Sequence, residues 1–405
     1  MSNLADRSSG TAAHATAASN GSHRVTVEIA DAARLSDMRT HWADLLGRAA
    51  APNVFMDPAL VSVATGIDPD ARHRALLAWE TTDGRNRLVG IWSFAVGRPR
   101  RSILPMQTIV IPAYAHGHLA TPVIDRDCLD ETLDAMLDGI ASDRQLPKII
   151  ALDAIGAGEP TYEALLRVLA ARGTAPCVFD RVQRPKLASA LDGKAYLESA
   201  LSSSTRKKLR QHRRKLSEKG ALTSTVATEP EAVRQALEEF LAMEASGWKG
   251  REGTALASKD GDAAFMRGAM AALAEHGNAA IHSIRLDGKP LSMQLVARAG
   301  GAAFTWKTTY DEAFYDFSPG MLLLEDYTAA FLADKSIAFV DSCSFDDTGF
   351  MSAWQERQEV ADLWIDARRG GSLEFRALSG LQKTYREARA TTKALYLQWR
   401  KSRKK

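Results

Sequence analysis

Hydrophobic and polar residues alternate in three consecutive runs between residues 281 and 310. The runs cover residues 281–286, 291–298 and 302–310, and this period of two predicts three strands. Asp287-Gly288 and Gly300-Gly301 separate them, as expected for tight hairpin turns. A loop of sequence DEAFYDFSPG follows, and apolar residues then recur at helical spacing from Gly320 onward. The segment therefore predicts an antiparallel meander that leads into the N-terminus of a helix.

The first half of the chain repeats this order of patterns. A hairpin through Asp83-Gly84 corresponds to the one through Asp287-Gly288. Seven strands are predicted, over residues 24–29, 74–80, 87–96, 108–111, 119–124, 148–152 and 177–182. Helices are predicted over residues 35–48, 129–141 and 162–171. The element order, without any residue-level repeat, suggests two related α/β halves.

A strongly basic helix is predicted near the middle of the chain, within residues 196–220. Residues 206–219 contain eight basic residues and one acidic residue. Such a face suits tRNA, a membrane surface or an anionic glycan. The alternative is a solvated face between domains, which the lack of interleaved aromatic residues favours. The remaining elements are strands over residues 222–226, 337–341 and 360–366, and helices over residues 231–246, 262–276 and 373–399.

Composition narrows the class of protein. The chain of 405 residues is 45% hydrophobic and 25% charged, with a net charge of +3, which is ordinary for a globular protein. Three scattered cysteines favour a reducing compartment over a disulfide framework, so we expect a cytoplasmic location. No stretch approaches the roughly 20 apolar residues of a membrane span. Residues 1–23 lack an apolar core and predict a disordered leader.

Three sequence runs carry a resemblance to a known family. LDGKPLSMQLVAR, TWKTTYDEAFYDFSPGMLL and FVDSC resemble the GNAT-type acyltransferases of the CelD/BcsL group, which are named for cellulose-biosynthesis loci and are distantly Fem-like. The resemblance is strongest over residues 195–365, although the GNAT signature Gln/Arg-x-x-Gly-x-Gly/Ala is absent. It implies an α/β fold of two tandem GNAT-like (acyl-CoA N-acyltransferase) domains with mixed sheets and flanking helices. The expected domains are residues 24–190 and 191–370, followed by a C-terminal basic helix over residues 371–405.

The predicted helix start at Ser318-Pro319-Gly320 is the candidate cofactor site. Free backbone N–H groups at a helix N-terminus bind phosphate, and a glycine allows close approach. The resemblance implies an acyl-CoA donor, with acetyl-CoA as the expected cofactor, and we assign its pyrophosphate to Ser318, Gly320, Met321 and Leu322. The alternative is a plain Pro-Gly turn before a core helix.

Candidate catalytic residues lie at strand ends. Tyr310 and Asp311 end the third strand, where a carboxylate can accept a proton and a phenol can return one to the thiolate. Asp341, at the end of the FVD strand, is a rival base because the family often has an aspartate there. The alternatives are a packed tyrosine and aspartates that only cap loops.

Aromatic and basic residues near these strands are candidate acceptor ligands. Trp248 and Lys249 lie in a glycine-flanked loop and could cover the acceptor or contact phosphate, unless Trp248 only packs on the surface. Trp306 and Trp354 complete the predicted substrate-binding set. His116-Gly117-His118 has a spacing that could suit a metal, but no third ligand stands nearby, so we predict no metal.

The sequence thus predicts a transferase that moves an acyl group to an amine or hydroxyl. The resemblance suggests a sugar or polysaccharide precursor as acceptor, and the acceptor would lie between the two halves. Nucleic acid is not an expected partner. Two alternatives remain open: a Fem-like transferase that uses aminoacyl-tRNA, and a non-catalytic accessory module of polysaccharide synthesis.

Overall fold

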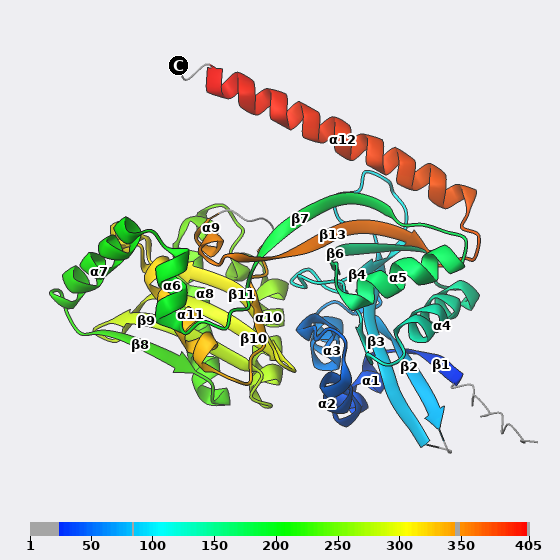
Figure 1. The fold of residues 1–405 in the computed structure, drawn as a ribbon, viewed down its shortest axis with the longest axis horizontal. Helices are drawn as coiled ribbons and strands as arrows, with labels where there is room; N and C mark the ends of the chain where they lie inside the picture. The colour runs from blue at the N-terminus through cyan, green and yellow to red at the C-terminus, as the bar shows by residue number, and fades with distance from the viewer. Residues whose placement is uncertain (1–23, 83–84, 345–348, 403–405) are drawn as a thin grey trace, which may run out of the picture.

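A computed structural model describes residues 24–82, 85–344 and 349–402. The strands of both halves join in one thirteen-stranded mixed sheet with helices on its faces, which confirms the predicted α/β class (Figure 1). The main elements of the first half are β1 (Arg24–Ala30), α1 (Ala32–Leu35), α2 (Arg39–Arg48), α3 (Pro58–Ile67), β2 (Arg74–Thr82), β3 (Arg85–Gly97), β4 (Thr108–Ile111), β5 (Val123–Ile124), α4 (Leu129–Ser142), β6 (Ile149–Ala157), α5 (Pro160–Ala171) and β7 (Cys177–Leu187). Those of the second half are α6 (Gly193–Ala200), α7 (Ser203–Ser217), β8 (Leu222–Ala227), α8 (Pro230–Ser246), α9 (Trp248–Arg251), α10 (Asp260–Ala274), β9 (Ala279–Leu286), β10 (Lys289–Ala299), β11 (Ala302–Tyr310), the 3-10 helix η5 (Glu312–Phe317), α11 (Pro319–Ala333), β12 (Phe339–Asp341), β13 (Glu356–Asp366) and α12 (Leu373–Ser402).

The two halves share one order of strand pairing. In the first half β1, β2, β3 and β4 pair antiparallel in sequence, and β6 then pairs parallel to β4 after helix α4. In the second half β8, β9, β10 and β11 do the same, and β12 pairs parallel to β11 after helix α11. A parallel pair needs a crossover connection, and α4 and α11 supply it.

The next strand of each half is exchanged. β7 follows β6 in the chain but pairs with β12, while β13 follows β12 and pairs with β6. β7 and β13 also pair with each other, antiparallel. The sheet order is therefore β1-β2-β3-β4-β6-β13-β7-β12-β11-β10-β9-β8, which reads equivalently from either edge. The sheet runs unbroken from one half to the other, and the domain boundary between residues 190 and 191 stays a prediction.

Left-handed backbone occurs at matching positions of the two halves. Ala154 (φ 60°) lies two residues after Leu152, the last residue of β6 that pairs with β4. Cys343 (φ 53°) lies two residues after Asp341, the last residue of β12 that pairs with β11. A non-glycine residue in this region is strained and marks a special local geometry. In both halves it marks the place where the two parallel strands diverge.

The meander of the second half forms as its pattern predicts. Asp287 (φ 49°) and Gly288 (φ 79°) are both left-handed, as a two-residue type I′ hairpin turn requires. Period-two alternation buries successive residues of β9 on opposite faces, with Ile281 in the core shared with the first half and Ile284 under helix α11. Helix α11 buries Leu322, Leu324, Tyr327 and Phe331 against that second face.

One hydrophobic core runs from the first half into the second. The ring of Phe55 lies 5.5 Å from that of Phe304 and 5.6 Å from that of Trp306. Helices α3 and α10 pack closely at Gly268, where a Cβ would lie only 2.7 Å from Val63 Cγ1. Helices α6, α7 and α11 cover the other face of the second half.

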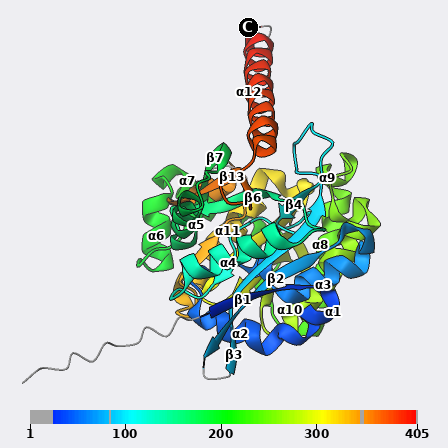
Figure 2. The same cartoon turned by 90° about the vertical axis from the view of Figure 1, so that its right-hand side faces the viewer.

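Some predicted elements differ from the structure. The helix expected over residues 35–48 is interrupted at Ser36–Met38 by a 3-10 turn, and only Val123–Ile124 of the strand expected over 119–124 pairs with the sheet. The predicted leader over residues 1–23 and the Asp83-Gly84 turn lie outside the described residues. Helix α12 projects away from the body (Figures 1 and 2). Within the described ranges, no helix has the length and apolarity needed to cross a membrane.

Candidate active site

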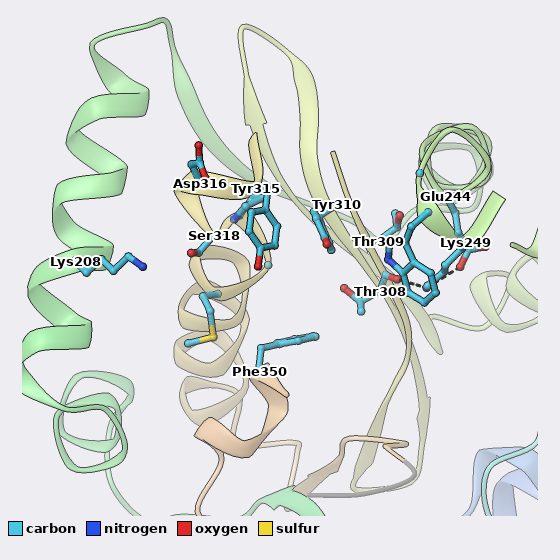
Figure 3. A pocket seen from close by; sticks show the side chains of 15 residues that line it. Lys208, Glu244, Lys249, Thr308, Thr309, Tyr310, Tyr315, Asp316, Ser318 and Phe350 are labelled. Carbon is cyan, nitrogen blue, oxygen red and sulfur yellow. Dashed lines mark hydrogen bonds and ion pairs between the residues drawn. The ribbon is translucent and has the colours of Figure 1, made fainter. Parts of the chain in front are cut away.

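A cavity of about 600 Å³ opens beside the end of β11 and the start of α11 (Figure 3). We call it the α11 cavity. Its walls come from helix α7, the end of α8 with α9, strand β11, η5 and the first turn of α11, and the segment around Phe350. It is lined by Lys208, Glu244, Gly247, Trp248, Lys249, Thr308, Thr309, Tyr310, Tyr315, Asp316, Ser318, Pro319, Gly320, Met321 and Phe350.

The cavity lies where strands β11 and β12 part. β12 pairs with β11 only over Ala302–Phe304, so the rest of β11 continues beyond its neighbour. Thr308, Thr309 and Tyr310, which line the cavity, belong to this uncovered part. Ligands of open α/β sheets bind beyond the carboxyl ends of strands, at points of this kind.

The first turn of α11 offers one free backbone donor. Ser318 is left-handed (φ 51°, ψ 54°) and precedes Pro319, which has no N–H. The N–H groups of Met321 and Leu322 both donate to Ser318 O, at 2.9 and 3.2 Å. Gly320 N–H has no hydrogen-bond partner among the described residues, and a Cβ there would meet nothing within 4 Å. The anion site at this helix start therefore has one backbone N–H to give instead of the several that the sequence predicts.

Helix α7 brings a cation to the cavity. Ser202 Oγ caps the helix by accepting from Thr205 N–H, and His212 Nδ1–H donates to Phe317 O at 2.8 Å, which fixes α7 against η5. Arg213 donates to Leu322 O at 2.9 Å. Lys208 then points from α7 toward the start of α11 (Figure 3). No ion pair of Lys208 occurs in the described part of the chain, so its ammonium is available to an anion.

A buried carboxylate forms part of the wall, and sequence reasoning missed it. Glu244 is 1% exposed; its two oxygens accept from Lys249 Nζ (2.9 Å) and from Leu256 N–H (2.8 Å). Lys249 Nζ also donates to Thr308 O at 2.8 Å. The pair thus ties α8 and α9 to β11. The available signal was its spacing, because Glu244 follows Val233, Leu237 and Phe240 on the apolar face of an amphipathic helix.

Tyr310 presents a phenol to the same space. Burial, helped by the nearby Glu312 carboxylate and Tyr315, raises the pKa of Tyr310 above its usual 10. The group is therefore protonated at neutral pH and can donate a proton. Its ring lies 6.5 Å from that of Tyr315, which is largely exposed at the cavity mouth.

Six of the predicted site residues line the α11 cavity, namely Trp248, Lys249, Tyr310, Ser318, Gly320 and Met321. Trp248 is 44% exposed, and its backbone N–H donates to Glu312 Oε1 at 2.7 Å. It is the first residue of the short helix α9, where a loop was expected.

The two predicted aspartates lie outside the cavity lining. Asp311 Oδ1 accepts from Ala313 N–H at 2.9 Å and caps η5. Asp341 is buried and accepts from Arg184 Nη1 (3.2 Å), from Cys343 N–H (2.7 Å) and from Gln358. Asp341 is thus held by its own neighbours, whereas Asp311 is half-buried and uses one oxygen as a helix cap, and the catalytic role of both stays a prediction.

Leu322, Trp306 and Trp354 have buried side chains away from the cavity lining. Trp306 Nε1–H donates to His116 O at 2.8 Å, which ties β11 to the first half. Trp354 Nε1–H donates to Thr328 Oγ1 at 2.9 Å beneath α11. The structure gives all three a packing position.

The two histidines of the predicted His116-Gly117-His118 motif are partly buried, and His116 contacts the second half. His116 Nε2 lies 3.0 Å from Asp262 Oδ1, while burial lowers the pKa of His118 well below 6.5. Within the described ranges, no three His, Cys, Asp or Glu side chains gather as a metal site.

Comparison with known proteins gives a domain match and a fold. Residues 203–344 match the family "Acetyltransferase (GNAT) domain". A structure of the C-terminal domain (DUF2156) of a putative lysylphosphatidylglycerol synthetase from Agrobacterium fabrum has a TM-score of 0.52 at 14% identity, over 86% of this chain and 96% of that one. FemX has a TM-score of 0.48 at 14% identity, over 73% of this chain and 87% of that one. A tandem GNAT protein from the clavulanic acid biosynthesis pathway has a TM-score of 0.42 at 12% identity, over 85% of this chain and 99% of that one. No curated protein sequence matches the chain.

The GNAT part of the predicted resemblance is confirmed over residues 203–344, the region that holds α7, β11 and α11. The likeness to the Agrobacterium fabrum domain concerns the fold alone. The narrower CelD/BcsL resemblance stays a prediction.

Proposed function

We propose that the protein transfers an acyl group, most simply acetyl, from acyl-coenzyme A to an amine or hydroxyl acceptor, with the donor in the α11 cavity. The observation that carries this is the place of the cavity. It opens at the divergence of β11 and β12, beside the first turn of α11, and it does so inside the region that matches a GNAT acetyltransferase domain.

The charges around the cavity suit the phosphates of the donor. Gly320 and Lys208 both line the cavity, and a phosphate placed there would accept from the Gly320 N–H and from the Lys208 ammonium. One free N–H binds a phosphate more weakly than the several N–H groups of a glycine-rich GNAT loop. We therefore assign Lys208 a larger share of phosphate binding than a side chain would have beside such a loop. The acyl end would then lie along the uncovered edge of β11, near Tyr310.

In the proposed reaction the acceptor nitrogen or oxygen attacks the thioester carbonyl carbon. A C–N or C–O bond forms, the C–S bond breaks, and the acceptor loses a proton to water. Tyr310 returns a proton to the leaving thiolate, a role that its protonated state permits. Most of the rate would come from holding the two reactants together.

The test is calorimetric titration of acetyl-CoA into the full chain and two variants of one residue. Gly320→Pro removes the free N–H, whereas Gly320→Ala keeps it and places a methyl group in open space. One hydrogen bond to a charged group is worth about 1.5–3 kcal/mol, so the proline variant should bind roughly ten to a hundred times more weakly than the alanine variant. Melting curves of both variants check that α11 is intact.

A third variant, Lys208→Gln, should weaken binding in the same range without touching α11. Equal affinity of the proline and alanine variants would remove the helix start from the site. Failure of the wild-type protein to bind acetyl-CoA, longer acyl-CoAs or free CoA would favour the accessory-module alternative.

The acceptor follows from the sequence resemblance alone, and we propose a sugar or polysaccharide precursor. Acyl transfer to such an acceptor is measured as release of free thiol from acetyl-CoA in the presence of an amino sugar such as glucosamine. Thiol release that needs the amino sugar supports the proposal, and release that is the same without it argues against this acceptor.

The aminoacyl-tRNA alternative depends on α7, and its cations are partly occupied. Arg213 pairs with Asp326 of α11, Arg206 with Glu198 and Arg214 with Glu218. Surface pairs of this kind lower the charge available to a nucleic acid. Salt-dependent tRNA binding that disappears when Lys207 and Lys215 are replaced by glutamine would favour this alternative.

A further inference from the structure

A second, smaller cavity of about 230 Å³ lies at the divergence of β4 and β6 and is also lined by residues of the exchanged strands β7 and β13. We call it the β6 cavity. It occupies the part of the first half that corresponds to the divergence of β11 and β12, next to left-handed Ala154. Its lining includes Arg100, Arg101, Asp153 and Asp362, so its wall is made of opposite charges.

Irregular strand pairing builds this cavity. Along β13 the register with β6 steps from Ala361↔Ile155 to Leu363↔Leu152, so Asp362 faces two residues, Asp153 and Ala154. The register of β13 with β7 also shifts, directly after Asp362. The pairing at Asp362 is therefore irregular with both neighbouring strands, β6 and β7. Such bulges re-aim side chains and are common beside binding sites.

The Asp153 carboxylate has an unsatisfied hydrogen-bond acceptor. Its Oδ2 is buried and has no hydrogen-bond partner in the part of the chain that the structure describes. The nearest cation is Arg100, whose Nε lies 3.7 Å away, beyond hydrogen-bond distance. Burial, with the Asp362 charge as the next cause, raises the pKa of Asp153 from 3.8 to about 6. A donor placed in the cavity would relieve this.

The other carboxylates of the cavity are already satisfied. Asp362 Oδ1 accepts from Ala154 N–H at 2.9 Å, and its Oδ2 lies 3.5 Å from both Arg101 and Arg386. Asp180 pairs with Arg386 at 2.9 Å. Asp153 is therefore the carboxylate toward which a ligand's ammonium or hydroxyl would be drawn.

Two arginines at the cavity have donors to spare. Arg100 Nη2 donates to the carbonyls of Tyr114 and Ala115, and Arg101, 59% exposed, makes the 3.5 Å pair with Asp362. A guanidinium has five N–H donors, so both can still bind an anion. Helix α12 holds their loop in place, because Gln382 Nε2 donates to Arg101 O at 2.9 Å.

We propose that the β6 cavity binds a small zwitterion of amino-acid size. The ligand's ammonium would donate to the Asp153 carboxylate, and its own carboxylate would accept from Arg100 and Arg101. The volume lies below the roughly 300 Å³ at which pockets for drug-sized ligands begin, so a whole coenzyme does not fit. The proposal does not depend on coenzyme A binding in the α11 cavity.

The test is calorimetry of the full chain with matched probes. L-Alanine, L-serine and β-alanine carry both charges, ethylamine lacks the carboxylate, and propionate lacks the ammonium. We expect at least one zwitterion to bind saturably, and each single-charge probe to bind at least roughly tenfold more weakly, since each loses a charge-assisted hydrogen bond. No saturable binding by any of the three zwitterions, or ethylamine binding as tightly as the best of them, overturns the proposal.

Variants locate the binding. Asp153→Asn and Arg101→Gln should each weaken the best zwitterion at least roughly tenfold. Asp127→Asn, at an exposed position outside the cavity, should leave it unchanged. Since Arg101 is exposed, its variant keeps the test valid even if the Asp153 variant melts early. Unchanged affinity in a folded Arg101→Gln variant would place the zwitterion elsewhere and refute this site.

Discussion

Asp153→Asn is expected to make the protein more stable at neutral pH. The Asp153 carboxylate is buried, its Oδ2 has no hydrogen-bond partner among the described residues, and Asp362 adds a like charge. Its pKa is about 6 in the folded protein, against an ordinary value of 3.8 for an unfolded chain. The folded state therefore binds the proton more tightly than the unfolded state does. Such a carboxyl group does not lower the free energy of unfolding while it is protonated in both states. It lowers that free energy progressively as the pH rises from about 4 to about 6.

The size of this cost follows from the two pKa values. Their difference of about 2 corresponds to about 3 kcal/mol at 1.36 kcal/mol per pH unit, and this net value already includes the attraction of Arg100. At pH 7 the wild-type protein bears the full cost. Asparagine has no charge to bury, so the variant should be up to about 3 kcal/mol more stable at pH 7 and equal near pH 4.

Urea denaturation followed by tryptophan fluorescence, at several pH values from 4 to 7, measures this. The informative quantity is the difference between the free energies of unfolding of variant and wild type, because other groups such as His282 (pKa about 4) titrate equally in both. Asp127→Asn, at an exposed position, controls for loss of a charge. A variant that is no more stable at pH 7, or a difference that does not change with pH, would refute the account of a desolvated, partnerless carboxylate.

Two further substitutions, each paired with a control variant, test buried contacts of the second half. Glu244→Ala should cost about 3–5 kcal/mol in urea denaturation, because it leaves the Lys249 ammonium without its buried partner, whereas Glu238→Ala, which breaks an exposed pair on the same helix, should cost under about 1 kcal/mol. Similar costs for both would contradict the buried role of Glu244. Gly193→Ala should cost about 1–3 kcal/mol by thermal melting, since its Cβ would lie 2.6 Å from the α11 backbone. Gly47→Ala meets nothing within 4 Å on a helix and should instead stabilise by up to about 1 kcal/mol, so a gain at both glycines would argue against the close contact of α6 and α11.

Local pattern was sufficient for the elements around the α11 cavity. β11 has the predicted bounds, α11 begins one residue before the predicted Gly320, and the Asp287-Gly288 turn has the dihedral angles that its two residues favour. These features depend on side-chain alternation and on residues close in sequence. Tyr310 and Gly320, which these elements carry, both line the α11 cavity.

Long-range contacts decided the rest. A strand-end position does not reveal the partner of its side chain, and Asp341 turned out to face Arg184, which is 157 residues away. A tryptophan can either pack in a core or bind a ligand, and its sequence position does not distinguish the two. Trp354 packs in the core, where its Nε1–H donates to Thr328. The raised pKa of Asp153 comes from burial and from the Asp362 charge on β13, and no spacing in the sequence reveals either cause. The exchange of β7 and β13 has no local signature either.

That exchange has a consequence for how the molecule can be divided. β13 fills the gap between β6 and β7, and β7 supplies the partner for β12. Cutting the chain between the halves would leave each piece without the strand that its counterpart lends, and with bare backbone donors and acceptors along an open border. Shuffling either half alone into another protein would carry the same defect. Because each half depends on a strand of the other, we expect the two halves to be inherited, expressed and lost as a unit.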